Sequence, residues 1–149
     1  MNNEELIAKL TKIFELFTEF NELSFKKSYD DLNINEVHTI DFIGKIEKVN
    51  VTKITNCLKI TKGGVTKITK KLIEKGYISS YQSENNKKEK YFKLTSKGEI
   101  IFRKHIELHE QAIKKDALIL NQFDNNEKII INEFLDVLSI DFENKLKEN

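Results

Sequence analysis

The sequence has no proline and no tryptophan, and only one cysteine and five glycines among its 149 residues. Because residues that break helices are scarce, long helices are favoured. One cysteine excludes a disulfide framework, and the acidic N-terminus does not resemble a signal peptide, so we expect a cytoplasmic protein. No stretch approaches the roughly 20 apolar residues of a membrane span, and no membrane partner is expected.

A formal net charge of +1 conceals an uneven distribution of charge. The basic segment, residues 59–104, contains 13 Lys and Arg but only 4 Asp and Glu, and the rest of the chain is acidic. Because phosphate groups dominate the affinity of proteins for nucleic acids, such a segment indicates a DNA- or RNA-binding surface. The alternative is a solvated lysine-rich face without a partner.

Apolar residues at three- and four-residue spacing predict six amphipathic helices. The first follows the apolar positions between residues 6 and 20 and is expected to fray over residues 26–31. Capping residues mark where the later helices begin: Asn33 or Asn35, Thr52, Thr61, Thr95 and Asp124. The fourth helix buries Val65, Ile68 and Leu72 and ends at Gly76.

After the fourth helix the periodicity changes to about two residues, which is typical of strands. Residues 77–81 and 90–94 are predicted to form a hairpin, and the polar stretch between them, residues 84–90, a long mobile loop. Two short helices followed by this ribbon indicate a winged helix-turn-helix, a mainly α fold with a small β-wing. In that fold the second helix enters the major groove and the ribbon reaches the neighbouring minor groove.

Three helices lie outside this winged core, and one chain can cover their apolar faces only in part. We therefore expect a DNA-binding lobe at residues 33–104 and a helical dimerisation region made of residues 1–32 and 105–149. The dimerisation helices would thus lie at the N- and C-terminal ends of the chain. Packing entirely within one chain is the alternative.

Two segments resemble the multiple-antibiotic-resistance regulator (MarR) family. TKGGVTKITKKLIEKGYI, residues 61–78, is similar to the recognition helix that runs into Gly-Leu-Ile, and LTSKG, residues 94–98, to the Leu-Thr-x-x-Gly that follows the wing. The resemblance implies a homodimeric, cytoplasmic transcription factor, usually a repressor of a palindromic DNA operator that a ligand or oxidation relieves.

The fourth helix presents a polar face opposite its buried stripe, at 100° per residue. We expect DNA contacts from this helix and its cap at Thr61, Lys62, Gly63, Thr66, Lys67, Lys70 and Lys71. Thr66 suits a base edge, whereas the lysines suit guanine acceptors or phosphates. A solvated lysine without a partner is the alternative at each lysine position.

The family usually carries Asp-Arg-Arg at the wing tip, and the matching residues here are Asn86, Lys87 and Lys88. Lysine supplies charge without the planar fork of arginine, so contacts of Lys87 and Lys88 with the minor groove should be mainly electrostatic. The bracing Asp of the family is missing.

The histidines predict a sensor site. His105 and His109 are one helical turn apart, and together with His38 they match a His set of the zinc-responsive branch of the family. That branch adds a first-helix Glu, for which Glu22 is the nearest candidate and Glu19 the next. A small organic ligand in the same cleft, or three unrelated surface histidines, are the alternatives. Zinc is thus the candidate effector and cofactor, and no other cofactor is predicted.

Two other kinds of chemistry are not expected. Cys57 lies in the short third helix, where a small buried apolar residue is the better interpretation, so a peroxide sensor is unfavoured. The sequence around His105 differs from a His-Glu-x-x-His motif because Glu107 is displaced by one position, and no P-loop or nucleophile elbow occurs. An enzyme is therefore not predicted. The remaining alternative to a regulator is a dimeric winged-helix module that binds proteins and not specific DNA.

Overall fold

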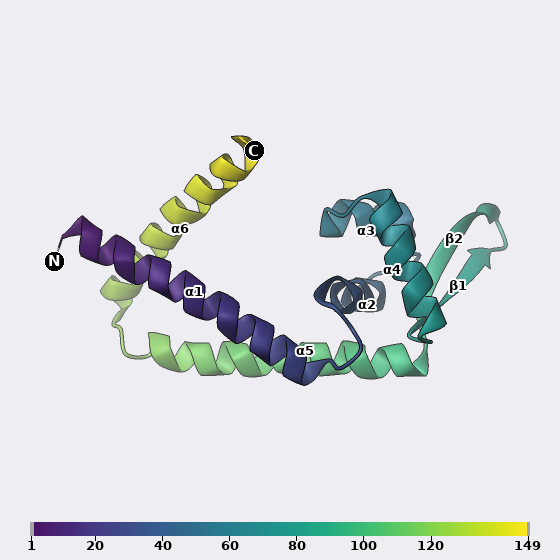
Figure 1. Cartoon of the computed structure of the whole chain (residues 1–149), viewed down its shortest axis with the longest axis horizontal. Coiled ribbons are helices and arrows are strands. Elements are labelled where there is room, and N and C mark those ends of the chain that lie inside the picture. Colours follow the sequence, from purple (N-terminus) through teal and green to yellow (C-terminus); the bar gives the residue numbers. More distant parts are fainter. Residues whose placement is uncertain (1, 149) are drawn as a thin grey trace. The chain divides into compact units, whose positions relative to one another are not determined.

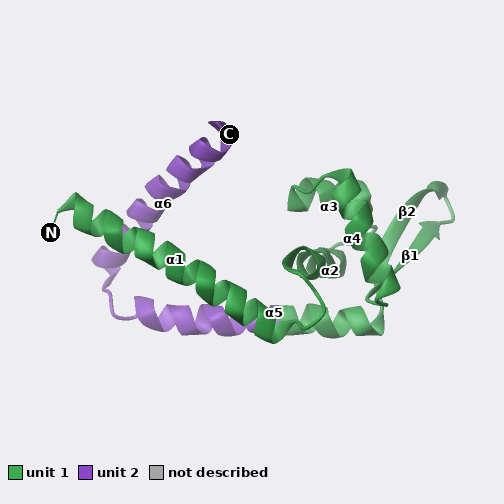
Figure 2. Ribbon diagram, in the orientation of Figure 1, with its two compact units in different colours: residues 1–105 green, residues 106–149 purple. Residues whose placement is uncertain are grey.

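The computed structural model describes residues 2–148 and divides into two compact units, residues 1–105 and residues 106–149 (Figure 2). In chain order the elements are α1 (Asn3–Ser28), α2 (Ile34–Lys45), α3 (Val51–Leu58), α4 (Lys62–Glu74), β1 (Ile78–Ser83), β2 (Asn86–Leu94), α5 (Ser96–Leu120) and α6 (Asn125–Glu148) (Figure 1). The predicted winged helix-turn-helix with additional N- and C-terminal helices is confirmed.

Most helix starts lie where capping residues predicted them. Asn33 and Glu36 form a capping box at the start of α2, with each side chain accepting the backbone N–H of the other at 3.0 and 2.9 Å. Asp124 and Glu127 do the same before α6. A capping residue followed three positions later by Glu therefore marks the start of a helix correctly at both places.

The start of α3 and the end of α1 differ from expectation. Asn50, not Thr52, caps α3, because its side chain accepts the N–H of Lys53 at 2.9 Å and asparagine is the stronger cap. With the cap two residues earlier, the N–H of Ile54, the buried residue of α3, donates to the carbonyl of Asn50. Helix α1 continues without fraying to Ser28.

Helices α2, α3 and α4 pack with the wing around one apolar core in the first unit. The buried apolar residues of these elements are Val37, Ile40, Ile43, Ile54, Val65, Leu72, Ile78, Tyr91 and Phe92. In α4 the expected stripe is corrected at one position, because Ile68 is only half-buried whereas Thr69 is 3 % exposed. Thr69 is tolerated there since its hydroxyl donates to the carbonyl of Val65 at 3.0 Å.

The wing is an antiparallel pair in which Ile78 faces Leu94 and Tyr81 faces Tyr91. The prediction of a long loop at residues 84–90 is wrong, because β2 begins at Asn86 and only two residues separate the strands. In a ribbon exposed to solvent, backbone hydrogen bonds are enough to pair the strands, and apolar side chains are not required. The polar composition of residues 84–90 therefore did not exclude a strand. Val49, before α3, adds a bridge to Phe92, whose N–H donates to the Val49 carbonyl at 2.8 Å.

The segment 94–98 leads from the wing into α5 and is hydrogen-bonded to the turn that follows α4. The Thr95 hydroxyl donates to the carbonyl of Gly76 at 2.6 Å and accepts the N–H of Gly98 at 3.2 Å, which confirms Thr95 as the cap of α5. A Cβ at Gly98 would lie 2.1 Å from the carbonyl oxygen of Tyr77. Gly98 is therefore required by close packing of backbone on backbone.

Helices α1 and α6 leave large apolar side chains in solvent. Within the described residues neither helix contains a buried residue. Exposed apolar residues include Ile7, Ile13, Phe17 and Phe20 on α1, and Ile130, Phe134, Leu135 and Val137 on α6. No helix among residues 2–148 is long and apolar enough to cross a membrane.

Replacing Gly98 by alanine should destabilise the fold by about 1–3 kcal/mol, because the new methyl group would collide with the Tyr77 carbonyl. The matched control is Gly63→Ala, where an added Cβ meets no atom within 4 Å and lies in a helix. The control should be neutral or gain up to about 1 kcal/mol. Urea unfolding followed by circular dichroism measures both, and equal stability of the two variants would contradict this role of Gly98.

Candidate nucleic-acid interface

The face of α4 opposite the core is polar and exposed. Val65, Thr69 and Leu72 are buried and fix the rotation of the helix about its axis. The residues expected to contact DNA from this helix and its cap are all exposed: Thr61, Lys62, Gly63, Thr66, Lys67, Lys70 and Lys71. This surface, the reading face below, thus has the position and charge that a recognition helix needs.

The start of α4 has two glycines with different roles. At Gly64 a Cβ would lie 2.8 Å from Cγ2 of Ile60, so packing requires glycine there. At Gly63 it would meet open space, which leaves the first turn of the helix bare on its outer side. The Thr61 hydroxyl accepts the N–H of Gly64 at 3.2 Å and caps the helix as predicted. A bare, positively polarised first turn favours close approach of a phosphate.

The polar groups of the reading face are already partly engaged within the helix. The Thr66 hydroxyl donates to the carbonyl of Lys62 at 2.8 Å, so toward a base it presents an acceptor oxygen and a methyl group. Nζ of Lys70 lies 4.0 Å from Oε1 of Glu74, a weak pair between exposed side chains. Neither contact was predicted from the sequence, although Thr66 and Lys62, like Lys70 and Glu74, are four residues apart and so lie one helical turn from each other.

On the wing, Lys87 and Lys88 are exposed at the start of β2, beside the turn. The Asn86 side chain accepts the N–H of Lys88 at 3.1 Å. Glu89, which the sequence did not single out, accepts the Tyr91 hydroxyl at 2.6 Å and the Asn50 amide at 3.4 Å. Glu89 therefore joins the wing to the cap of α3.

Two of the three histidines lie together in the first unit. The ring centroids of His38 and His105 are 5.8 Å apart, with an interplanar angle of 60°. Nδ1 of His105 lies 3.0 Å from the hydroxyl of Tyr29, and both of these side chains are buried. Burial, followed by the negative charge of Asp41, raises the pKa of Tyr29, so Tyr29 acts as a neutral phenol. Its hydroxyl thereby orients the ring of His105.

The spacing of these two rings can be compared with that of two zinc-bound imidazoles. Two imidazoles on one tetrahedral zinc have centroids roughly 5 Å apart, given Zn–N bonds of about 2.0–2.1 Å. With Nδ1 of His105 directed at Tyr29, Nε2 is the nitrogen on the opposite side of the ring. Glu22 is exposed on α1, and His109 is exposed on α5, within residues 106–149. Among the described residues no group of three or more His, Cys, Asp or Glu is arranged to hold a metal ion.

Cys57 is exposed, and the expectation that it is a buried apolar residue is wrong. Helix α3 has only eight residues, and Ile54 is its one buried side chain among those described. A short helix of this kind covers the core with a narrow stripe, and Cys57 lies outside that stripe.

Comparison with known proteins agrees with this geometry. Residues 32–90 match the family model "MarR family". The HTH-type transcriptional regulator PchR of Bacillus subtilis is 34 % identical over 139 residues, which cover 93 % of this chain and 79 % of PchR.

Solved structures similar to the chain include a protein–DNA complex. Streptococcus pneumoniae FabT in complex with DNA has a TM-score of 0.76 and 30 % identity, covering 96 % of this chain and 99 % of FabT. Lactococcus lactis ZitR, a zinc-responsive MarR family member, has a TM-score of 0.77 and 25 % identity, covering 92 % of this chain and 99 % of ZitR. The matched sequence, the wing and the reading face together show that the chain belongs to the MarR family of DNA-binding transcriptional regulators.

Proposed function

We propose that this regulator is a homodimeric, cytoplasmic repressor of a palindromic operator. The observation that carries this proposal is the reading face, on which the exposed residues Thr66, Lys67 and Lys70 follow the bare first turn at Gly63. Helix α4 would enter the major groove, and Lys87 and Lys88 of the wing would follow the neighbouring minor groove. The similarity to FabT, solved in complex with DNA, supports this arrangement.

Exposed apolar side chains support the homodimer. Phe17 of α1 is 63 % exposed and Phe134 of α6 is 52 % exposed, and each helix carries several such residues. Exposed apolar surface of this extent is rare on monomers and is covered when a second chain binds. A two-fold dimer would bring two copies of α4 to half-sites roughly 34 Å apart, one turn of DNA.

We further propose that a divalent metal, zinc by preference, controls DNA affinity. The paired rings of His38 and His105 and the similarity to zinc-responsive ZitR support this. Both imidazoles would each donate a nitrogen lone pair to a bound zinc, and His109 and Glu22 are the proposed additional ligands. His38 belongs to α2, which packs in the DNA-binding lobe, and His105 belongs to α5. Tyr29 would keep the tautomer and orientation of His105 suitable for binding.

Replacing Lys67 by alanine should weaken operator binding and lower the salt dependence of affinity by about one unit of slope, because one phosphate contact is lost. Thr66→Ala should instead change sequence preference and leave the slope unchanged. Fluorescence anisotropy over a salt series, with a selected operator and its single-base variants, measures both quantities. If the two variants lower affinity equally for all sequences, Thr66 does not read a base.

Replacing Phe134 by aspartate should dissociate or unfold the protein, because a charge would be placed on an apolar face that a second chain covers. The control Asn126→Asp adds the same charge at an exposed polar position of α6. Analytical ultracentrifugation should find a dimer for the wild type and the control. A wild-type monomer at micromolar concentration would contradict the homodimer.

Zinc should raise the melting temperature of the wild-type protein, and His38→Ala and His105→Ala should each abolish most of that increase. Cys57→Ser, which removes the exposed thiol, is the control and should retain the increase. Differential scanning calorimetry with one equivalent of zinc, followed by metal analysis after gel filtration, makes the measurement. An unchanged melting temperature in the wild type would exclude zinc and favour an organic ligand or no effector.

A further inference from the structure

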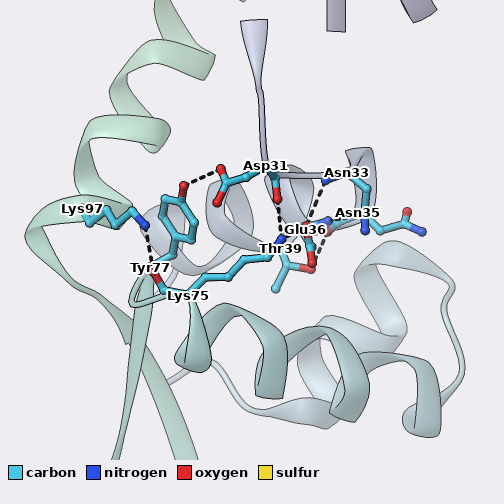
Figure 3. Close-up of polar contacts among 8 residues, drawn as sticks. All are labelled: Asp31, Asn33, Asn35, Glu36, Thr39, Lys75, Tyr77 and Lys97. Carbon is cyan, nitrogen blue, oxygen red and sulfur yellow. Dashed lines mark hydrogen bonds and ion pairs between the residues drawn. The ribbon is translucent and has the colours of Figure 1, made fainter. Parts of the chain in front are cut away.

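Lys75, which follows the last residue of α4, bonds to two points near the start of α2. Its Nζ donates to the backbone carbonyl of Asp31, in the connection between α1 and α2, and lies 3.0 Å from Oε2 of Glu36 (Figure 3). These partners are 44 and 39 residues away in sequence. The C-terminal end of the reading helix is therefore attached by one side chain to the segment that leads out of α1.

Glu36 is buried and therefore needs the attachment to Lys75. Its carboxylate is 1 % exposed, and Oε2 also accepts the N–H of Asn33 in the capping box. A buried carboxylate without a cationic partner is strongly unfavourable, whereas the pair together contributes little net stability compared with apolar residues. The pair therefore acts mainly as a geometric constraint, because Lys75 must stay within reach of Glu36 for the carboxylate to remain paired.

The helix dipoles strengthen the same constraint. Glu36 lies in the first turn of α2, where the helix end is partly positive, and Lys75 lies at the C-terminal end of α4, which is partly negative. Each charge thus stabilises its own helix end as well as its partner. The two oppositely polarised helix ends are held together at the position of this ion pair.

Asp31 also holds the root of the wing. Its carboxylate accepts the Tyr77 hydroxyl at 2.8 Å, and Tyr77 directly follows the turn at Gly76. Burial, then the hydrogen bond to Asp31, raises the pKa of Tyr77 to about 12, so the phenol stays protonated and continues to donate. One residue of the connection, Asp31, therefore binds both the end of α4 and the start of the wing.

Helix α5 completes the cluster. Nζ of Lys97 donates to the backbone carbonyl of Lys75 at 2.9 Å and lies 4.1 Å from the centroid of the Tyr77 ring (Figure 3). The side chain of Lys75 is 31 % exposed and is directed toward Asp31 and Glu36. Lys75 therefore binds protein partners and is directed away from the reading face that carries Lys67.

We propose that Lys75 is a positioning residue for operator recognition, which sets the placement of the reading helix relative to the connection between α1 and α2. In the homodimer proposed above, on which this inference rests, that placement determines the distance between the two reading helices. Lys75 thereby determines which spacing of DNA half-sites the dimer accepts, although it contacts no DNA.

The test compares operators whose half-site spacing differs by one base pair. Lys75→Met keeps the aliphatic stem and removes the charge, and Lys75→Met with Glu36→Gln also removes the unpaired buried carboxylate while keeping an acceptor for Asn33. We expect the double variant to be folded, to bind the best operator about fivefold or more weakly, and to discriminate less between spacings. Lys75→Arg, which can donate to both acceptors, should restore wild-type discrimination.

The dependence of affinity on salt separates positioning from a phosphate contact. In the double variant the slope should be unchanged, whereas Lys67→Met should lower it by about one. A slope lowered by one in the double variant would assign Lys75 to DNA and overturn the proposal. A folded double variant with wild-type affinity and wild-type spacing discrimination would reduce Lys75 to a stabilising role and overturn it as well.

A measurement without DNA keeps this inference distinct from the proposed function. Spin labels at Gly63→Cys, where the outer side is open, report the distance between the two reading helices in a Cys57→Ser background. The distance distribution should be narrow with Lys75 or Arg at position 75, and broad in the double variant. Equal widths would overturn the positioning role even if the wild type binds its operator. A narrow wild-type distribution with no operator binding would instead contradict the proposed function.

Discussion

The buried carboxylate of Glu36 imposes a condition that four parts of the first unit have to meet. It must find donors, because a charge almost wholly removed from water is otherwise strongly unfavourable. The N–H of Asn33 and the ammonium group of Lys75 supply them, and Lys75 in turn binds the connection before α2. The start of α2, the end of α4, the connection and the root of the wing are consequently held in one arrangement.

That arrangement explains how a short helix can present a reading face. Burial of Val65, Thr69 and Leu72 fixes the rotation of α4, and the attachment at Lys75 fixes its C-terminal end. Just after α4, Gly98 lets the backbone of α5 approach the Tyr77 carbonyl closely. The family motif that contains Gly98 thus serves the geometry of the junction between the reading helix, the wing and α5.

The surroundings of the histidines could not be predicted from local sequence patterns. Their spacing in the sequence predicts one site, and in the structure the ring centroids of His38 and His105 lie 5.8 Å apart. What orients His105 is Tyr29, 76 residues earlier in the chain, and no sequence pattern links the two. The proposed metal site would need side chains from separate helices, and neither spacing nor residue type in the sequence can bring such side chains together.

The sequence by itself determined what depends on neighbouring residues: the helix caps at Asn33, Thr61, Thr95 and Asp124, the change of period at the wing, and the outward lysines of α4. These follow from hydrogen bonds and side-chain directions within one turn. Only the tertiary structure decided that β2 reaches Asn86, that Val49 pairs with Phe92, and that Lys75 serves Glu36 rather than solvent. The last two of these pairings join residues about 40 positions apart in the chain. Their partners are selected by the packing of the whole lobe, because the sequence pattern does not distinguish a lysine that binds a buried carboxylate from one that is solvated.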